Sequence, residues 1–467
     1  MHAIDDLVTW APLLGVMWAD DAGGLRSPGA YVAGHVEQRG GFGFSTPPGQ
    51  RPPLSEGAIW AVAGPLGLDP IAVIRDALTG AGMDRISYVA QFWPGGRVEL
   101  HLITFGPAVE VTAGGIELGS LVLVEAAVPE PWRRTPAPQP RARPHASVDL
   151  DLLERTLRER FPEAIGATAD EIAVTESRLG LPLPAELKVF YQVRRGRWTD
   201  RRGDYGKDFE RVVTAVGCQP LPLDELYLAT AATRPCPWLY AATHAAITLP
   251  GDAVQGLAGS PGWIVFGSDG CGDRVAIDLT PGPRGNIGQV IMIDRVQPIG
   301  AGLYARSLTA MVKKPPRRWS AGRPAEMPFV ARVNRGALHS IEAAVGPDLE
   351  VLSIGAWEGE PLSLAPVAAL PRLRTLTALP GTLADPLEIA RLTGLEFLAL
   401  GPEEWRILLD ADAVPVGLRA AAVEPHGSHN PLPLVAIANE LLARWDRPLI
   451  TKTLIEGDLN EALPGLV

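Results

Sequence analysis

Two short, basic, proline-rich stretches interrupt this chain of 467 residues. They read PEPWRRTPAPQPRARPHA from residue 129 and KKPPRRWSAGRP from residue 313. Proline favours extended, exposed backbone, so neither stretch suits a domain interior. The net charge of -11 arises in the three segments that they separate, each of which is acidic. We therefore expect domains at 1–130, 148–312 and 326–467, joined by linkers at 131–147 and 313–325.

The composition narrows the class of protein. Hydrophobic residues make up 46% and charged residues 20%, which is typical of a folded protein. No apolar run reaches the roughly 18 residues that a membrane span needs, and the acidic start, MHAIDDL, lacks the basic beginning of a secretory signal. We therefore expect a cytoplasmic protein with no membrane partner. Acidic domains also argue against nucleic acid as a direct ligand.

The first segment predicts a small α+β domain of unknown family. Ser55 and Asp69 suit the starts of two helices, which Gly67 and Gly80 would end. Two alternating runs, RISYVAQF and RVELHLITF, flank a Pro-Gly-Gly turn and predict a β-hairpin. The run GIELGSLVLVEAAV indicates another strand.

The middle segment predicts a helix pair followed by a β-meander. Thr168 and Glu171 have capping-box spacing at the start of the first helix, and Gly180 ends that helix. Pro182 and Pro184 stiffen the turn into the second helix, LPAELKVFYQV. Three strand-like runs come later, joined by glycine-rich turns: residues 263–267, 274–279 and 289–294.

The sequence motifs of the middle segment, and their order, resemble those of the SUKH superfamily, also called the Smi/Knr superfamily. The resemblance rests on EIAVTESRLGLPLPAELKVFYQV and FGSDGCGDRVAIDL, and it covers about residues 148–312. One departure follows the second helix, where RRGRW stands in place of the Asn-Gly-Gly of many members. The resemblance implies a non-enzymatic protein that binds other proteins. Bacterial members neutralise polymorphic or contact-delivered toxins, and eukaryotic members act as signalling scaffolds.

The last segment contains a leucine repeat. Leu349, Leu373, Leu395 and Leu418 begin four similar cores at spacings of 24, 22 and 23 residues. Such spacing is typical of leucine-rich repeats, whose short strands bury their leucines against the next repeat. The asparagine usual after the strand is absent, so the pattern predicts a degenerate α/β solenoid, with PLPLVAIANELLARW as a terminal helix. In this interpretation Leu376 points into the stack and Thr375 points outward. The alternative is a small α/β domain with accidental spacing.

The arginine-rich end of the second helix is the candidate partner-binding site. Arg194, Arg195, Arg197 and Trp198 lie where a helix meets a loop, and tryptophan and arginine are frequent in binding hot spots. A local positive site would favour an acidic patch on a partner. The alternative is a solvated helix end with a partly packed tryptophan.

Asp269 and Asp273 complete the partner-binding candidates. Both lie in a glycine-rich turn, where aspartate commonly accepts hydrogen bonds from backbone amides, so a turn role is the more frequent outcome. His426 and His429 have metal-like spacing without a matching Cys or Asp cluster. The chain has no phosphate loop, nucleophile elbow or H-E-x-x-H motif. We therefore expect no catalytic residue, no metal and no cofactor.

These observations predict a bacterial immunity protein of the toxin–antitoxin kind that binds one protein partner. The alternative is an intracellular regulatory scaffold or adaptor with no toxin partner. A third class, an enzyme whose activity lies in residues 1–130, stays open.

Overall fold

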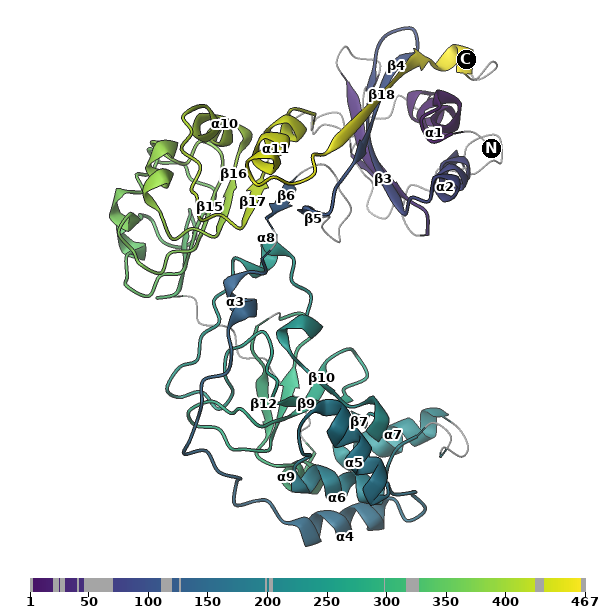
Figure 1. Cartoon of the computed structure of the whole chain (residues 1–467), viewed down its shortest axis with the longest axis vertical. Helices are drawn as coiled ribbons and strands as arrows, with labels where there is room; N and C mark the ends of the chain where they lie inside the picture. Colours follow the sequence, from purple (N-terminus) through teal and green to yellow (C-terminus); the bar gives the residue numbers. More distant parts are fainter. Residues whose placement is uncertain are drawn as a thin grey trace. The chain divides into compact units, whose positions relative to one another are not determined.

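The computed structural model describes most of the chain and divides it into two compact units (Figure 1). Unit 1 comprises Met1–Ala127, Pro237–Leu239 and Ala331–Val467, and unit 2 comprises Val128–Cys236 and Tyr240–Val330. The fold is mixed α/β, and its strands form open sheets in the part of the chain that is described. The described residues are 3–19, 25, 30–39, 42–45, 70–110, 120–125, 127–197, 200, 205–297, 299–315, 327–424 and 432–462.

The first sheet of unit 1 is antiparallel, with strand order β18-β4-β3-β1-β2. Helices α1 and α2 cover one of its faces (Figure 1), where Trp10 and Leu78 are fully buried. The predicted β3–β4 hairpin and the predicted helix from Pro70 are confirmed, whereas the helix predicted from Ser55 lies outside the described residues. The elements are β1 (Tyr31–Glu37), β2 (Phe42–Ser45), β3 (Arg85–Phe92), β4 (Arg97–Thr104), β18 (Thr451–Asp458), α1 (Leu7–Ala19), α2 (Pro70–Ala81) and α12 (Leu459–Ala462).

The second sheet of unit 1 has the order β13-β14-β15-β16-β17-β6-β5. Strands β14 to β17 are parallel and in register, so that Leu352, Leu376, Leu398 and Ala421 form one buried row. Short helices connect the strands. The elements are β5 (Val109–Glu110), β6 (Leu121–Val124), β13 (Val330–Val333), β14 (Val351–Ile354), β15 (Thr375–Ala378), β16 (Phe397–Leu400), β17 (Ala420–Val423), η4 (Glu342–Ala344), η5 (Ala365–Val367), η6 (Pro386–Arg391), α10 (Pro402–Asp410) and α11 (Leu432–Arg444).

The first and last predicted domains fold together in unit 1. Strand β17 pairs with β6, and β18 pairs with β4, so each sheet takes strands from both ends of the chain. The middle segment is therefore an insertion into a discontinuous unit, not the second of three consecutive domains. Charge and proline content carry no information on strand pairing between distant segments.

The predicted linker at 131–147 packs along unit 2. Trp132 lies in α3 (Glu130–Arg133) and is buried. The Gln255 amide holds Ala137 twice, donating to its carbonyl at 2.9 Å and accepting from its N–H at 2.8 Å. The hydroxyls of Ser147 and Ser307 are 2.9 Å apart. The backbone N–H and C=O groups of an extended proline-rich segment are not used in a helix or sheet. Here side chains of unit 2 form hydrogen bonds with some of them. Within the second predicted linker, residues 316–325 lie outside the described residues.

Unit 2 contains the predicted helix pair and β-meander. Its sheet has the order β12-β11-β10-β9-β7, with β8 also pairing with β9. Phe190 and Tyr191 of α6 pack edge to face, and Phe190 also packs against Phe266 of β9. The elements are α4 (Leu150–Arg160), α5 (Ala169–Leu179), α6 (Ala185–Val193), α7 (Tyr205–Val216), α9 (Leu308–Lys313), η2 (Leu223–Glu225), η3 (Ala231–Thr233), β7 (Gln219–Pro220), β8 (Tyr227–Leu228), β9 (Trp263–Ser268), β10 (Arg274–Asp278), β11 (Gln289–Ile293) and β12 (Gly302–Ala305). Helix α8 (Trp238–Ala241) begins in unit 1, which includes Trp238, and ends in unit 2.

Candidate binding site after helix α6

The start of α5 is fixed by the predicted capping box. The Thr168 hydroxyl accepts a hydrogen bond from the Glu171 N–H at 3.2 Å, and the Glu171 carboxylate accepts one from the Thr168 N–H at 2.8 Å. Gly180 ends the helix with φ 72°, in the left-handed region that favours glycine. Helix α6 then ends at Val193, so the arginine-rich segment begins immediately after it.

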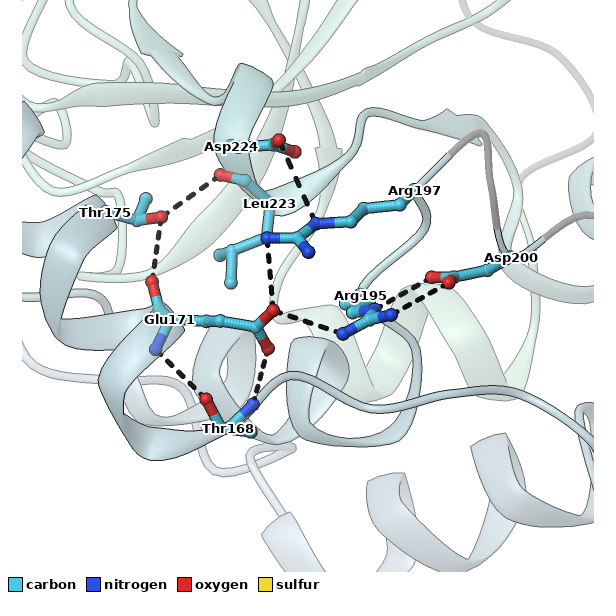
Figure 2. Close-up of polar contacts among 8 residues, drawn as sticks. All are labelled: Thr168, Glu171, Thr175, Arg195, Arg197, Asp200, Leu223 and Asp224. Carbon is cyan, nitrogen blue, oxygen red and sulfur yellow. Dashed lines mark hydrogen bonds and ion pairs between the residues drawn. The ribbon is translucent and has the colours of Figure 1, made fainter.

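Glu171 has a second role, because its other carboxylate oxygen accepts from two arginines. Arg195 Nη1 and Arg197 Nη2 each lie 3.1 Å from Glu171 Oε1 (Figure 2). Arg195 also makes a two-pronged contact with Asp200, with both N···O distances at 2.9 Å. Such paired contacts fix the orientation of the guanidinium as well as its position.

Backbone contacts hold the same segment in place. Arg195 donates its N–H to the Ile165 carbonyl at 2.9 Å and accepts from the Leu223 N–H at 3.0 Å. The Thr175 hydroxyl lies 3.2 Å from the Glu171 carbonyl and 3.4 Å from that of Leu223 (Figure 2). The segment is therefore tied both to α5 and to η2.

The arginines do not form the isolated positive patch that the sequence predicts. Arg195 and Arg197 are matched by nearby carboxylates, including Asp224, which lies 4.0 Å from Arg197 Nε. The guanidinium of Arg194 lies over the Phe161 ring, 5.5 Å from its centre. The expectation was wrong because these carboxylates come from α5, η2 and a later turn, and a count of charges within RRGRW omits them. The arginine side chain with the greater exposure is Arg197, at 43% against 22% for Arg195.

Comparison with known families identifies the domain that carries this network. Residues 166–314 match the SMI1/KNR4 family, also named SUKH-1. The chain contains a SUKH-1 domain. The match confirms the resemblance that the two sequence motifs predicted. The matched region begins at residue 166, whereas the sequence motifs suggested a start at about 148.

Short stretches of the chain are similar to curated fungal proteins. The chain is 48% identical over 50 residues to the "cell wall biosynthesis/cell cycle regulator smi1" of Schizosaccharomyces pombe, which is 11% of this chain and 10% of that protein. It is 46% identical over 48 residues to "KNR4/SMI1 homolog 2" of Debaryomyces hansenii, which is 10% of this chain and 8% of that protein. The chain thus covers a tenth or less of the length of these relatives, and the likeness is local. Across the described residues, no helix is both long enough and apolar enough to span a membrane.

Asp269 and Asp273 serve the β9–β10 turn of the SUKH-1 domain. Asp269 Oδ1 accepts from the Cys271 N–H at 2.7 Å and from the Asp273 N–H at 2.9 Å. Asp273 Oδ1 accepts from the Arg295 N–H at 3.0 Å. These are the turn contacts expected of aspartate, and they do not include the Glu171 network. Three residues from the sequence analysis, Trp198, His426 and His429, lie outside the described residues.

The SUKH-1 domain also buries a carboxylate at the end of β10. Asp278 is fully buried and accepts from the Thr280 N–H at 2.8 Å and the Gln289 amide at 2.9 Å. Burial raises the pKa of this carboxyl to about 6, although these hydrogen bonds act in the opposite direction. Because Gln289 also donates to the Ala253 carbonyl at 2.7 Å, Asp278 helps to connect β10 and β11 with the loop before them.

Glu171 is identifiable from the sequence as a helix cap, but its contacts with the arginines were not predicted. Asp200 and Asp224, the other carboxylates of the site, were not predicted either. A usable signal was present: an acidic residue follows Arg195 five positions later, in the word RRGRWTD. The contact with Asp224 depends on how η2 folds back, for which the sequence offers no local pattern.

The network should make the domain sensitive to acid. The hydrogen bond from the Thr168 N–H lowers the pKa of Glu171, with a further contribution from Arg197 and Arg195. Arg195 lowers the pKa of Asp200. Because both folded values lie below the unfolded ones of 4.5 and 3.8, the stabilisation is complete above the unfolded values and is lost as pH falls through the folded values.

We expect Glu171→Gln to lose less thermal stability than wild type between about pH 6 and about pH 3, because the glutamine has no proton to gain. Thermal unfolding at the two pH values measures this difference. Glu154→Gln is the control, since Glu154 forms an exposed ion pair with Arg158 on α4. An equal acid response in wild type and Glu171→Gln would contradict the prediction.

Proposed function

We propose that the SUKH-1 domain binds a protein partner and that the chain is a cytoplasmic, non-enzymatic immunity protein that neutralises a polymorphic or contact-delivered toxin. The observation that carries the proposal is the family match over residues 166–314. The resemblance is to the superfamily as a whole, and the toxin as partner is proposed from what the bacterial members of that superfamily bind.

The mixed-charge segment after α6 is the proposed contact surface. Arg197 is half exposed, and its guanidinium pairs with Glu171 at 3.1 Å and with Asp224, itself 62% exposed, at 4.0 Å. Arg195, tied to Asp200 and Glu171, acts as a positioning residue for this arrangement. A partner that fits it presents both a carboxylate and a hydrogen-bond donor, since complementary charges fix register at an interface. This replaces the purely acidic patch expected from the sequence.

Co-expression with toxin domains encoded by neighbouring genes tests the proposal. We expect one toxin to form a stoichiometric complex with the full chain and growth to be rescued in cells that produce that toxin. A failure of every neighbouring toxin domain both to bind and to be neutralised would contradict immunity and favour the scaffold described below.

Within such a complex, Arg197→Ala should weaken binding by about five- to thirtyfold, because loss of an interface arginine commonly costs about 1–2 kcal/mol. Isothermal titration with the purified toxin domain measures the change. Arg158→Ala is the matched control, because Arg158 is an exposed, ion-paired arginine of the same unit on α4. Unchanged affinity in Arg197→Ala, or equal weakening in Arg158→Ala, would place the contact surface elsewhere.

A regulatory scaffold without a toxin is the second candidate function. Its support is the similar Schizosaccharomyces pombe protein, which is named a regulator of cell wall biosynthesis and the cell cycle. Under this alternative the chain binds an endogenous protein and gives no protection against any toxin.

We also propose that β14 to β17 are degenerate leucine-rich repeats. The leucine spacing predicts such repeats, and the parallel strands, in register and joined by short helices, support them. An array of this kind would give the chain a second surface for proteins, separate from the SUKH-1 domain.

A further inference from the structure

Strand β18 forms an exposed edge of the first sheet in unit 1. It runs for eight residues and pairs with β4 along its whole length, and it is the terminal strand in the sheet order of the described residues. Its first four residues are exposed, including Leu454 with 51% of its surface accessible. An edge strand carries a row of backbone donors and acceptors that can pair with another strand.

The two faces of β18 differ in chemistry. Lys452, Leu454 and Glu456 share one face, since alternate residues of a strand point the same way. Thr453 and Ile455 share the opposite face, where they lie beside Leu102 and Leu100 of β4. The first face therefore carries a cation, an apolar residue and an anion at equal spacing.

An open cavity of about 510 Å³ lies beside Thr453. Its lining is mostly apolar and includes Ala77, Met83, Ile86 and Leu102. The cavity lies over the face of the sheet, between strands β3, β4 and β18 and the end of helix α2, and Thr453 is the residue that the edge strand contributes to it.

We propose that β18 pairs antiparallel with β18 of a second copy of this chain, with Leu454 on the two-fold axis. In this register Lys452 lies opposite Glu456 of the second copy, and the symmetry creates this pair twice. Leu454 meets Leu454 of the second copy, and Ile455 of the second copy lies opposite Thr453. Opposite charges and apolar side chains directly across an antiparallel pair stabilise it, whereas like charges destabilise it.

Charge exchange tests the register. We expect sedimentation velocity of the full chain to show a concentration-dependent dimer. Lys452→Glu or Glu456→Lys should each raise the dimer dissociation constant by about tenfold, because each sets like charges opposite one another twice. The combined K452E/E456K variant should restore dimerisation, since it exchanges the charges and keeps the pairs.

The combined variant also separates pairing between copies from effects inside one chain. Glu456→Lys also removes the ion pair of Glu456 with Arg97 of its own sheet, at 3.4 Å, and adding Lys452→Glu does not restore that pair. If the combined variant dimerises again, the recovery therefore comes from the charge pairs between the two copies. Leu454→Asp should abolish the dimer, while Val416→Asp, at a fully exposed position of the same unit, should leave it unchanged.

Three outcomes would overturn the proposal. If the wild-type chain stayed monomeric up to about 100 µM, β18 would not pair with a second copy. Lys452 would then have the role that lysines have on other edge strands, which is to prevent pairing with another chain. A dimer that persists in Leu454→Asp would use another surface. Loss of dimerisation in both single variants without recovery in the double variant would exclude this register.

Discussion

Replacing Glu350 by alanine should lower the free energy of unfolding of unit 1 by about 3–5 kcal/mol, because removing one member of a buried ion pair leaves an uncompensated charge in the interior. Glu350 Oε2 lies 3.2 Å from Arg374 Nε, and the two side chains are only 2% and 8% exposed. Glu350 Oε1 also accepts from Arg372 Nη2 at 2.8 Å. The substitution therefore removes a counter-charge that desolvated Arg374 contacts directly.

Hydrogen exchange of the full chain in increasing urea measures this effect, read from peptides that cover residues 349–400. Glu358→Ala is the matched control. Glu358 pairs with Arg335 at 2.5 Å in the same unit, but its side chain is 74% exposed. Exposed pairs contribute about 1 kcal/mol or less. Equal losses in the two variants would show that burial does not set the contribution of the Glu350–Arg374 pair.

Glu350 belongs to a ladder of alternating charge. Glu350, Arg374, Glu396 and Arg419 each precede one of the strands β14 to β17. Each later residue donates its backbone N–H to the carbonyl of the residue before it, at distances of 2.8–2.9 Å. Glu125 then donates to Arg419 at 2.7 Å and also pairs with its side chain. Opposite charges thus lie side by side from strand to strand.

The ladder was visible in the sequence, although the leucine pattern alone did not predict it. The words DLEVLSI, RLRTLTA, GLEFLAL and GLRAAAV place Glu and Arg alternately after the first leucine. The spacing of the leucines identifies the row of residues that faces the core. The alternation of Glu and Arg at the position after the first leucine also indicates which strands are neighbours.

Local elements could be predicted because the interactions that define them are short in sequence. The capping box at Thr168, the glycine stop at Gly180 and the Pro-Gly-Gly hairpin join residues a few positions apart, and the structure contains all three. The meander of unit 2 was predictable for the same reason, since its antiparallel neighbours follow one another along the chain.

The organisation of the whole chain could not be predicted in this way. The pairing of β17 with β6 and of β18 with β4 joins segments from opposite ends of the sequence, and alternation alone does not select partners. The candidate site has the same difficulty. Glu171 and Asp224 flank the arginines only after α5 and η2 have folded around them.

Replacing Leu376 by alanine should destabilise unit 1 by about 2–5 kcal/mol, the usual cost of a large-to-small change in a core. Leu376 is fully buried and lies in register with Leu352 on one side and Leu398 on the other. The smaller side chain would leave a cavity between two neighbouring strands, and both would lose packing contacts.

Thr375 lies on the opposite face of the strand from Leu376, but it is not the exposed position that the sequence pattern predicts. Thr375 is also fully buried. Arg374 Nη1 lies 3.4 Å from its hydroxyl, and in the same row the ring of Phe397 stacks on Trp238 at 6.2 Å. The second face of the strand is therefore covered at this row, whereas a repeat pattern predicts it to be open.

Leu387 in η6 is the better control for Leu376, because it is the same residue type and is 40% exposed. Leu387→Ala should change stability by about 0.5 kcal/mol or less, as surface substitutions usually do. Urea unfolding followed by hydrogen exchange over residues 349–400 compares the two variants. If both lost the same stability, the row of Leu352, Leu376 and Leu398 would not be the part of the core that holds the parallel strands together.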